Sequence, residues 1–182
     1  REGGRALAGE GTTQVPASPE EVWQTLLDPE KLAAVIPGCH HLVLAGDNDY
    51  RAEITLGVGP VRGRFRASVR LSDLDPPRSV MLSGGLDGPL GSSRGEGRVR
   101  LEPADGGTEV TYTYTVEVSG KVAAVGGRML EGAARFVVGQ FFERLAAEGA
   151  EWAARADDFR DALDQRQRHR ARDFNAERRR VA

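Results

Sequence analysis

The chain has 182 residues, of which 40% are hydrophobic, and its formal net charge of -2, with a pI near 6.0, gives it no overall basic field. This balance argues against nucleic acid as a partner of the protein body. A single cysteine and three histidines exclude an intrachain disulfide framework and the common all-protein zinc cages, so we expect a reducing, cytoplasmic setting.

The length suits one domain with an appendage. A domain of this size buries roughly 70% of the surface that its unfolded chain exposes, which leaves room for an internal cavity. We treat residues 1–8 as a remnant of processing, residues 9–148 as the domain and residues 149–182 as a charged extension. We expect neither a signal peptide nor a membrane span, because no stretch approaches the roughly 20 apolar residues that a span needs.

Two short helices are predicted after an extended segment from Gly9 to Val15. Ser18 suits the N-cap of the first, and Pro19 suits its first helical position. The apolar face of this helix should end at Asp28-Pro29, because proline disfavours a helical residue before it. The second helix is expected at about Glu30 to Val35.

Beyond residue 40 the hydrophobic period changes from helical to two. Apolar and polar side chains alternate strictly in Tyr50 to Val58, Val61 to Leu71 and Glu109 to Val118. Glycine, proline and aspartate between these runs mark turns. Alternation with short connections predicts an antiparallel sheet that is covered on one face only.

The cover of that face is expected to be a helix from Lys121 to Glu148. Its apolar residues recur at helical spacing: Met129, Leu130, Ala133, Val137, Phe141 and Leu145. Several glycines interrupt this stretch, and each costs up to about 1 kcal/mol relative to alanine inside a helix. Such glycines are expected where a helix approaches a neighbour closely or leaves space beside it. The sequence therefore predicts an α+β protein.

Several short motifs resemble the carbon monoxide dehydrogenase G-subunit family, a branch of the START-like, helix-grip superfamily that includes polyketide cyclases and birch-pollen-allergen-like carriers. They are Val15-Pro16-Ala17, Glu21-Val22-Trp23, Asp28-Pro29-Glu30, Ile36-Pro37-Gly38-Cys39, Ser119-Gly120-Lys121, Gly127-Arg128 and Phe141-Phe142. The resemblance spans about Leu7 to Glu148. It implies a curved antiparallel sheet of about seven strands wrapped round a long C-terminal helix, with two short helices after the first strand.

The resemblance also implies a function. It suggests a hydrophobic tunnel and a non-catalytic carrier or recruiting role for a quinone or lipid-like molecule, beside a molybdenum-containing carbon monoxide dehydrogenase. On this interpretation we expect no catalytic residue, no metal site and no cofactor, and we do not expect an enzyme.

A ligand cavity is predicted between the sheet and the last helix. Small residues on the covered face of one strand, Gly95 and Gly97, would leave volume beneath a helix that also carries glycines. The residues expected to bind the ligand are Ile54, Leu56, Phe65, Ala67, Leu82, Gly97, Val99, Tyr112, Tyr114, Met129, Ala133, Phe136 and Val137. The alternative is that these side chains simply fill the core, as most interior side chains do.

Other interpretations stay open. Tyr112 or Tyr114 could donate a proton in a polyketide cyclase or aromatase-like enzyme, although buried tyrosines more often only satisfy their hydroxyl groups. Cys39 and the adjacent histidines are expected to be incidental. Arginines on the polar side of one strand, Arg62, Arg64, Arg66 and Arg70, are either solvated or form a docking surface, as a ligand-free assembly factor would need.

The extension carries a small apolar stripe and a basic end. Trp152, Ala156, Phe159 and Leu163 fall at helical spacing, which predicts either a separate amphipathic helix or a continuation of the preceding helix past Gly149. From Gln165 to Ala182, seven arginines face two acidic residues, a net charge of +5. This segment could contact anionic lipid at the inner face of the membrane, or it could be solvated or disordered.

Overall fold

The structure, a computed structural model, describes residues 4–181, apart from the side chains of residues 152, 153, 156, 157 and 181. Its elements in chain order are β1 (Arg5–Val15), α1 (Pro19–Leu27), α2 (Pro29–Val35), β2 (Cys39–Gly46), β3 (Asp49–Val58), β4 (Val61–Asp75), β5 (Ser79–Gly88), β6 (Gly91–Ala104), β7 (Gly107–Ser119), the 3-10 helix η1 (Lys121–Val125) and α3 (Gly127–Val181). β1 thus begins within residues 1–8, the segment that we expected to be a remnant outside the domain.

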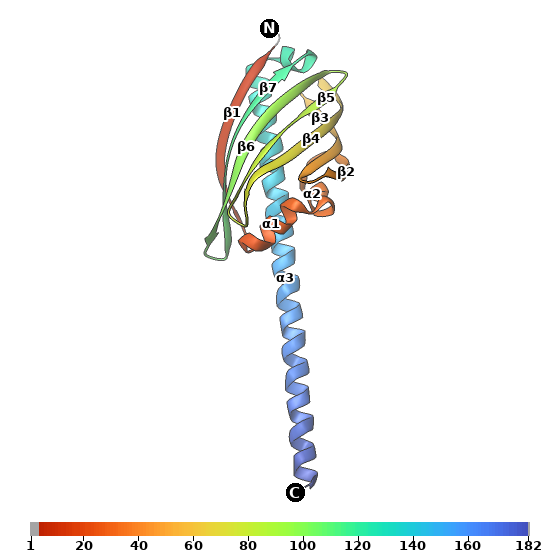
Figure 1. The fold of residues 1–182 in the computed structure, drawn as a ribbon, viewed down its shortest axis with the longest axis vertical. Helices are drawn as coiled ribbons and strands as arrows, with labels where there is room; N and C mark the ends of the chain where they lie inside the picture. The colour runs from red at the N-terminus through yellow and green to blue at the C-terminus, as the bar shows by residue number, and fades with distance from the viewer. Residues whose placement is uncertain (1–3, 182) are drawn as a thin grey trace.

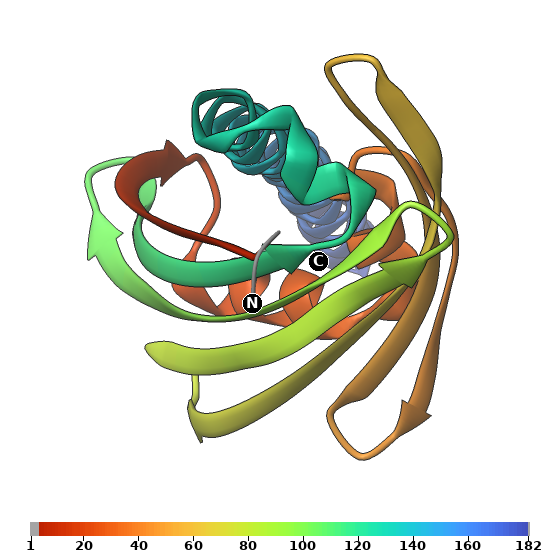
Figure 2. The same ribbon diagram turned by 90° about the horizontal axis from the view of Figure 1, so that it is seen from above.

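All the strands form one antiparallel sheet in the order β1-β7-β6-β5-β4-β3-β2. The sheet curves, and α3 lies along its concave side (Figures 1 and 2). This arrangement confirms the seven-stranded helix-grip fold and the two short helices after the first strand. The C-terminal part of α3 leaves the sheet and projects as a single helix away from the end that holds the N-terminus (Figure 1).

Side-chain caps set the ends of the two short helices. The Ser18 hydroxyl accepts a hydrogen bond from the Glu21 amide at 3.2 Å, and the Glu21 carboxylate accepts one from the Ser18 amide at 3.1 Å. Asp28 ends α1, and its carboxylate accepts a hydrogen bond from the Glu30 amide at the start of α2. These bonds satisfy amides that a helix end leaves free. α1 begins at Pro19, as the sequence predicts, and α2 begins at Pro29, one residue before its expected start.

A tight turn at Gly38 links α2 to β2. Gly38 has a φ of 73°, and a Cβ atom there would collide with the Thr55 carbonyl oxygen. The Gly38 carbonyl accepts a hydrogen bond from the Thr55 amide at 2.9 Å. The Ile36-Pro37-Gly38-Cys39 motif therefore has a structural cause, because only glycine permits both this conformation and this approach to β3.

The strand register places alternate residues on the concave face, as the sequence predicts. Across the middle of the sheet, Tyr114 of β7 pairs with Gly97 of β6, and Gly97 pairs with Leu82 of β5. The next row of the same face contains Tyr112 and Val99, which pair with each other. Because side chains alternate along a strand, these two rows both face α3.

Two apolar clusters fasten α3 to the sheet. One includes Trp23, Leu101, Val110, Phe142 and Leu145, next to α1. The other lies at the opposite end of the concave face, and its buried members are Leu7, Phe65, Val118, Val122, Ala123 and Leu130. The core is thus divided between the two ends of the helix-sheet contact.

The C-terminal helix differs from its expected boundaries. Gly120 and Gly126, with φ values of 87° and 100°, enclose η1, so the region from Lys121 is not one helix. α3 then continues without a break past Gly149 to Val181, as one of the two alternatives for the extension supposed. No helix within residues 4–181 combines the length and the apolar character needed to cross a bilayer.

Thr108 connects the β6–β7 hairpin to the chain that enters α1. Its side chain is fully buried, and its hydroxyl donates a hydrogen bond to the Ala17 carbonyl at 2.6 Å. Thr108→Val should lower the free energy of unfolding by about 1–3 kcal/mol, because a buried carbonyl loses its partner. Urea unfolding measures the change. Thr111→Val, on the exposed face of β7, is the matched control, and equal effects of the two substitutions would contradict this role.

Candidate functional site

The middle of the concave face is less well covered than its ends. Leu82, Leu86 and Val99 face α3 but are only half-buried, whereas Leu101 and Phe65, in the two clusters, are buried. The main contacts of α3 with the sheet are to β1, at one edge, and it also contacts β3 near the other edge. A helix that is held at its ends and at the sheet edges leaves the central side chains partly accessible.

Four aromatic rings line one side of this region. The Tyr112 and Tyr114 rings are stacked with centroids 6.4 Å apart, and the Tyr112 and Phe142 rings are stacked at 4.6 Å. Phe141 meets Phe142 edge to face at 5.0 Å. Such arrangements add about 0.5–1.5 kcal/mol per pair beyond area burial, so the row is a stable surface.

Two glycines of β1 explain how the tyrosine rings lie. Gly9 is the register partner of Tyr114, and Gly11 is the partner of Tyr112. A Cβ atom on Gly9 would collide with the Tyr114 ring, and one on Gly11 would collide with the Tyr112 hydroxyl. Each ring therefore lies across a glycine of the neighbouring strand. The sequence analysis missed this role, although the i, i+2 spacing of the two glycines was a usable signal.

A pocket of about 430 Å³ opens between β1 and α3 beside these rings. Tyr112 and Tyr114 form one wall, and Ala134, Arg135 and Gly139 of α3 contribute to the other. Burial raises the pKa of Tyr114, the neighbouring Tyr112 raises it further, and the Arg135 guanidinium partly opposes the shift. The Tyr114 hydroxyl is consequently neutral at physiological pH and available as a hydrogen-bond donor.

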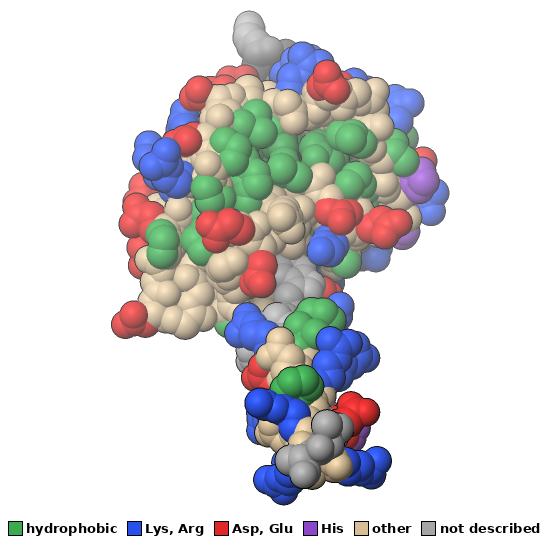
Figure 3. All heavy atoms as spheres, turned by 60° about the horizontal axis from the view of Figure 1, so that its bottom comes forward, with side chains coloured by type: hydrophobic (Ala, Val, Ile, Leu, Met, Phe, Trp, Pro, Cys, Tyr) green, Lys and Arg blue, Asp and Glu red, His purple; other side chains and the backbone are tan. Residues whose placement is uncertain are grey.

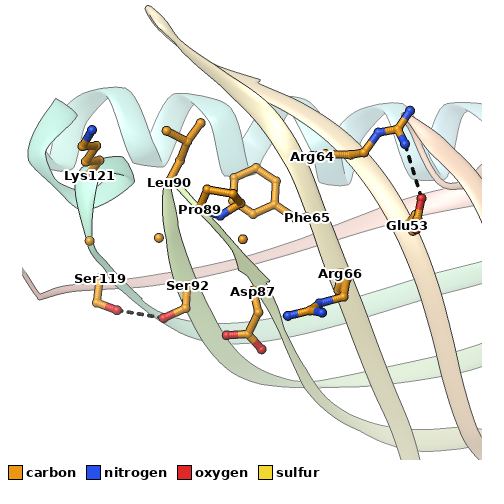
Figure 4. A pocket seen from close by; sticks show the side chains of 13 residues that line it. Glu53, Arg64, Phe65, Arg66, Asp87, Pro89, Leu90, Ser92, Ser119 and Lys121 are labelled. Carbon is orange, nitrogen blue, oxygen red and sulfur yellow. Dashed lines mark hydrogen bonds and ion pairs between the residues drawn. The ribbon is translucent and has the colours of Figure 1, made fainter.

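A second, larger pocket lies on the other side of the sheet's midline. It has a volume of about 910 Å³ and is lined by β4, by the β5–β6 turn and by the start of η1 (Figure 4). Phe65 and Leu90 give it apolar surface, and Arg64, Arg66 and Lys121 give it cationic side chains. Charged side chains also line the smaller pocket, namely Glu10, Glu131 and Arg135, so both pockets are more polar than the cavity that the sequence predicts.

The thirteen predicted ligand-binding residues occupy several environments. Tyr112 and Tyr114 line the smaller pocket, and Phe65 lines the larger one. Ile54 and Ala67 are buried, while Leu56, Leu82, Gly97, Val99, Ala133 and Val137 are half-buried. Met129 and Phe136 have 43% and 65% of their surface exposed. Neither of the two pockets contains more than two of the thirteen. Arg135, Gly139 and β1 were not among the predicted residues.

Cys39 and the neighbouring histidines lie at the start of β2. Burial raises the pKa of the half-buried Cys39 thiol, which keeps it protonated and a weak nucleophile. The His40 ring lies 2.6 Å from the Thr55 hydroxyl on the exposed surface, and His41 is also exposed. The incidental role of these three residues stays a prediction.

The arginines of β4 lie on the convex face, where acidic residues of β3 accompany them. Arg64 approaches Glu53 at 3.6 Å, and Arg70 approaches Asp49 at 3.5 Å. Exposed pairs of this kind contribute about 0–1 kcal/mol. Acidic neighbours therefore offset the charge of two of the four arginines, which favours solvation of these side chains over a continuous basic docking surface.

Tyr114 provides a test of the smaller pocket. Arg135→Gln should raise the pKa of Tyr114 further, because the substitution removes the cation that favours the tyrosinate. Titration of tyrosine absorbance in the near ultraviolet measures the shift, and Tyr114→Phe identifies the signal. Arg128→Gln, at an exposed position of the same helix, is the control. An unchanged titration in Arg135→Gln would mean that Arg135 does not lie near the ring in solution.

Comparison with known proteins places this architecture in a family. A conserved protein from Geobacillus kaustophilus has a similar structure, with a TM-score of 0.75 and 38% identity over 80% of this chain and 96% of that one. The Zhui aromatase/cyclase from Streptomyces sp. R1128 matches with a TM-score of 0.59 and 17% identity, over 80% of this chain and 94% of that one. Ara h 8.0201 matches at 0.57 and 13%, over 81% and 99%.

The last two likenesses show a common fold. No curated protein matches the chain. The family model for the carbon monoxide dehydrogenase G-subunit (CoxG) matches residues 11–149, which include β2 to β7, the end of β1, both short helices and the part of α3 that packs on them. The chain therefore belongs to the CoxG family, that of the carbon monoxide dehydrogenase G-subunit.

Proposed function

We propose that this protein is a non-catalytic carrier that holds a small apolar ligand, such as a quinone, between β1 and α3. The observation that carries the proposal is the pocket of about 430 Å³ beside the tyrosine rings. The volume lies within the usual range of roughly 300–1,000 Å³ for small-molecule sites. Membership of the CoxG family supports an accessory role beside a molybdenum-containing carbon monoxide dehydrogenase.

The chemistry of the pocket suits a flat ligand with a carbonyl group. The faces of Tyr112 and Tyr114 offer stacking surface, and the neutral Tyr114 hydroxyl can donate a hydrogen bond to a quinone oxygen. The half-buried centre of the concave face, at Leu82 and Val99, offers apolar surface for a side chain of the ligand. A carrier needs only these contacts, because it does not have to stabilise a transition state.

The projecting part of α3 supports recruitment to the inner face of the membrane. At about 100° per residue, Phe159, Leu163 and Phe174 fall within an arc of about 60°. Their exposed fractions are 64%, 39% and 61%. Arginines border this arc, among them Arg178, whose guanidinium carbon lies 5.7 Å from the centroid of the Phe174 ring. Figure 3 shows this part of the helix with hydrophobic side chains isolated among charged ones.

Three aspartates of the same segment lie on the other side of the helix, whereas Glu177 falls at the edge of the apolar arc and Asp173 lies about 70° from its middle. Asp158, Asp161 and Asp164 are all exposed, and each falls more than about 100° from the middle of the apolar arc. A helix lying on an anionic surface would insert its phenylalanines, place the bordering arginines among the head groups and keep these aspartates in water. The three aspartates therefore favour this orientation on a membrane, whereas Glu177 opposes it.

Ligand binding is tested by filling the pocket from the helix side. Gly139 lines the pocket, and a Cβ atom there would meet no other atom within 4 Å. Gly139→Phe should therefore fold normally and weaken binding of a soluble quinone analogue by at least about tenfold, which corresponds to about 1.4 kcal/mol. Ala147→Phe, at an exposed position of α3, is the matched control. Tyr114→Phe should cost about two- to tenfold through the lost hydrogen bond.

Fluorescence titration measures these affinities, and native mass spectrometry of protein purified from cells should detect a bound apolar molecule. A protein that is always empty and binds neither quinones nor lipids would contradict the carrier role. A cyclase or aromatase-like activity remains the second candidate, because two tyrosines line one pocket. It requires turnover of a cyclisable substrate that Tyr114→Phe or Tyr112→Phe abolishes.

Membrane contact is tested with vesicles. The full chain should sediment with vesicles rich in anionic lipid and should be released by salt, since each basic residue contributes about 1 kcal/mol near the surface. Combined Phe159→Ser and Phe174→Ser should reduce sedimentation several-fold, whereas Gln165→Ser, an exposed control on the other side of the helix, should not. Removal of residues 151–182 should abolish binding. Sedimentation that is independent of these residues would contradict the orientation.

A further inference from the structure

A mismatch between two strand ladders opens a notch in the sheet. β4 pairs with β3 from Val61 onward, but its pairing with β5 begins only at Arg66, opposite Asp87. β5 ends at Gly88, and the chain then turns into β6. The first five residues of β4 therefore lack a neighbouring strand on one side. The larger pocket, of about 910 Å³, lies at this notch.

The floor of the notch is apolar. Phe65 has only 7% of its surface exposed, and both Phe65 and Leu90 belong to the apolar cluster beside η1. The Leu90 side chain lies against Gly63, and the Leu90 carbonyl accepts a hydrogen bond from the Val122 amide at 2.9 Å. These contacts hold the β5–β6 turn against β4 and η1, so the floor is a fixed surface.

The rim of the notch is polar and carries an excess of positive charge. Ser92 and Ser119 form a hydroxyl pair at 3.0 Å on one side (Figure 4). Three cations and two acids line the pocket: Arg64, Arg66, Lys121, Glu53 and Asp87. Glu53 pairs with Arg64 at 3.6 Å, and Asp87 is the register partner of Arg66. Lys121 is thereby left without an acidic counterpart among the residues that line the pocket.

We propose that this notch is a second binding site, for an amphiphilic anion that joins a carboxylate to an apolar chain. The apolar chain lies on Phe65 and Leu90, and the carboxylate meets the Lys121 ammonium and the Arg66 guanidinium. The serine hydroxyl groups supply further hydrogen-bond donors at the rim. An apolar floor with a small number of convergent polar groups is the usual composition of a small-molecule site.

This site is independent of the pocket at Tyr114. The two pockets have no lining residue in common, and one lies at β1 while the other lies at β4 and the β5–β6 turn. The notch also accounts for Ser119-Gly120-Lys121, a motif that the quinone-type pocket does not use. The proposal therefore does not require that the carrier role be correct.

The test compares decanoate with decanol, which share a chain length and differ in the charge of the head group. Isothermal titration calorimetry on the full chain should show tighter binding of decanoate, with an affinity that falls as salt is added. Lys121→Gln and Arg66→Gln should each weaken decanoate binding by about two- to fivefold, the range of an exposed ion pair, and leave decanol binding unchanged. Both side chains are exposed, so neither substitution should disturb folding.

Arg62→Gln is the matched control, because Arg62 lies on the same face of β4 but does not line the pocket. It should leave decanoate binding unchanged. Gly139→Phe, which fills the pocket at Tyr114, should also leave it unchanged, so the two sites can fail separately. Equal affinities for decanoate and decanol, or equal effects of Lys121→Gln and Arg62→Gln, would overturn the proposal.

Discussion

The attachment of α3 to the curved sheet by two separate apolar clusters is the constraint on which the binding surfaces depend. One cluster holds Leu145 and Phe142 against the end of the sheet near α1, and the other holds Leu130 against Phe65 and Val118. Between them the strands bow while α3 runs nearly straight (Figure 1). A straight rod and a curved surface cannot remain in close contact along their whole length, so the middle of the concave face stays half-buried.

Small residues determine what this space contains. Gly9 and Gly11 allow the two tyrosine rings to lie across β1, and Gly139 leaves the facing side of α3 open. A helix glycine costs about 1 kcal/mol relative to alanine. The chain tolerates this cost at a position where a larger side chain would enter the pocket. Stability and the proposed ligand binding therefore favour different residues at Gly139.

α3 is one continuous helix whose two parts lie in different environments. Its first part, up to Gly149, packs on β1 and on the link to α1, and its second part has its described side chains exposed. No residue breaks the helix at the boundary, so a force or orientation imposed on the projecting part is transmitted directly to the helix that covers the sheet. This continuity relates the proposed membrane contact to the proposed ligand pocket, because both include residues of α3.

The sequence by itself determined an antiparallel sheet covered on one face, the two capped helices and the strand faces, because these follow from local caps and from period-two alternation between neighbouring residues. The helix-grip arrangement followed only from the resemblance to a known family. It also indicated Tyr112 and Tyr114 as members of a candidate site. The tertiary structure alone decided that Gly9 and Gly11 lie under those rings, that Arg135 faces Tyr114, and that Phe136 is exposed. It also decided where β4 lacks a partner. These features depend on strand register and on the rotation of α3 about its own axis. Contacts between residues distant in the chain set both, and hydrophobic periodicity does not encode them.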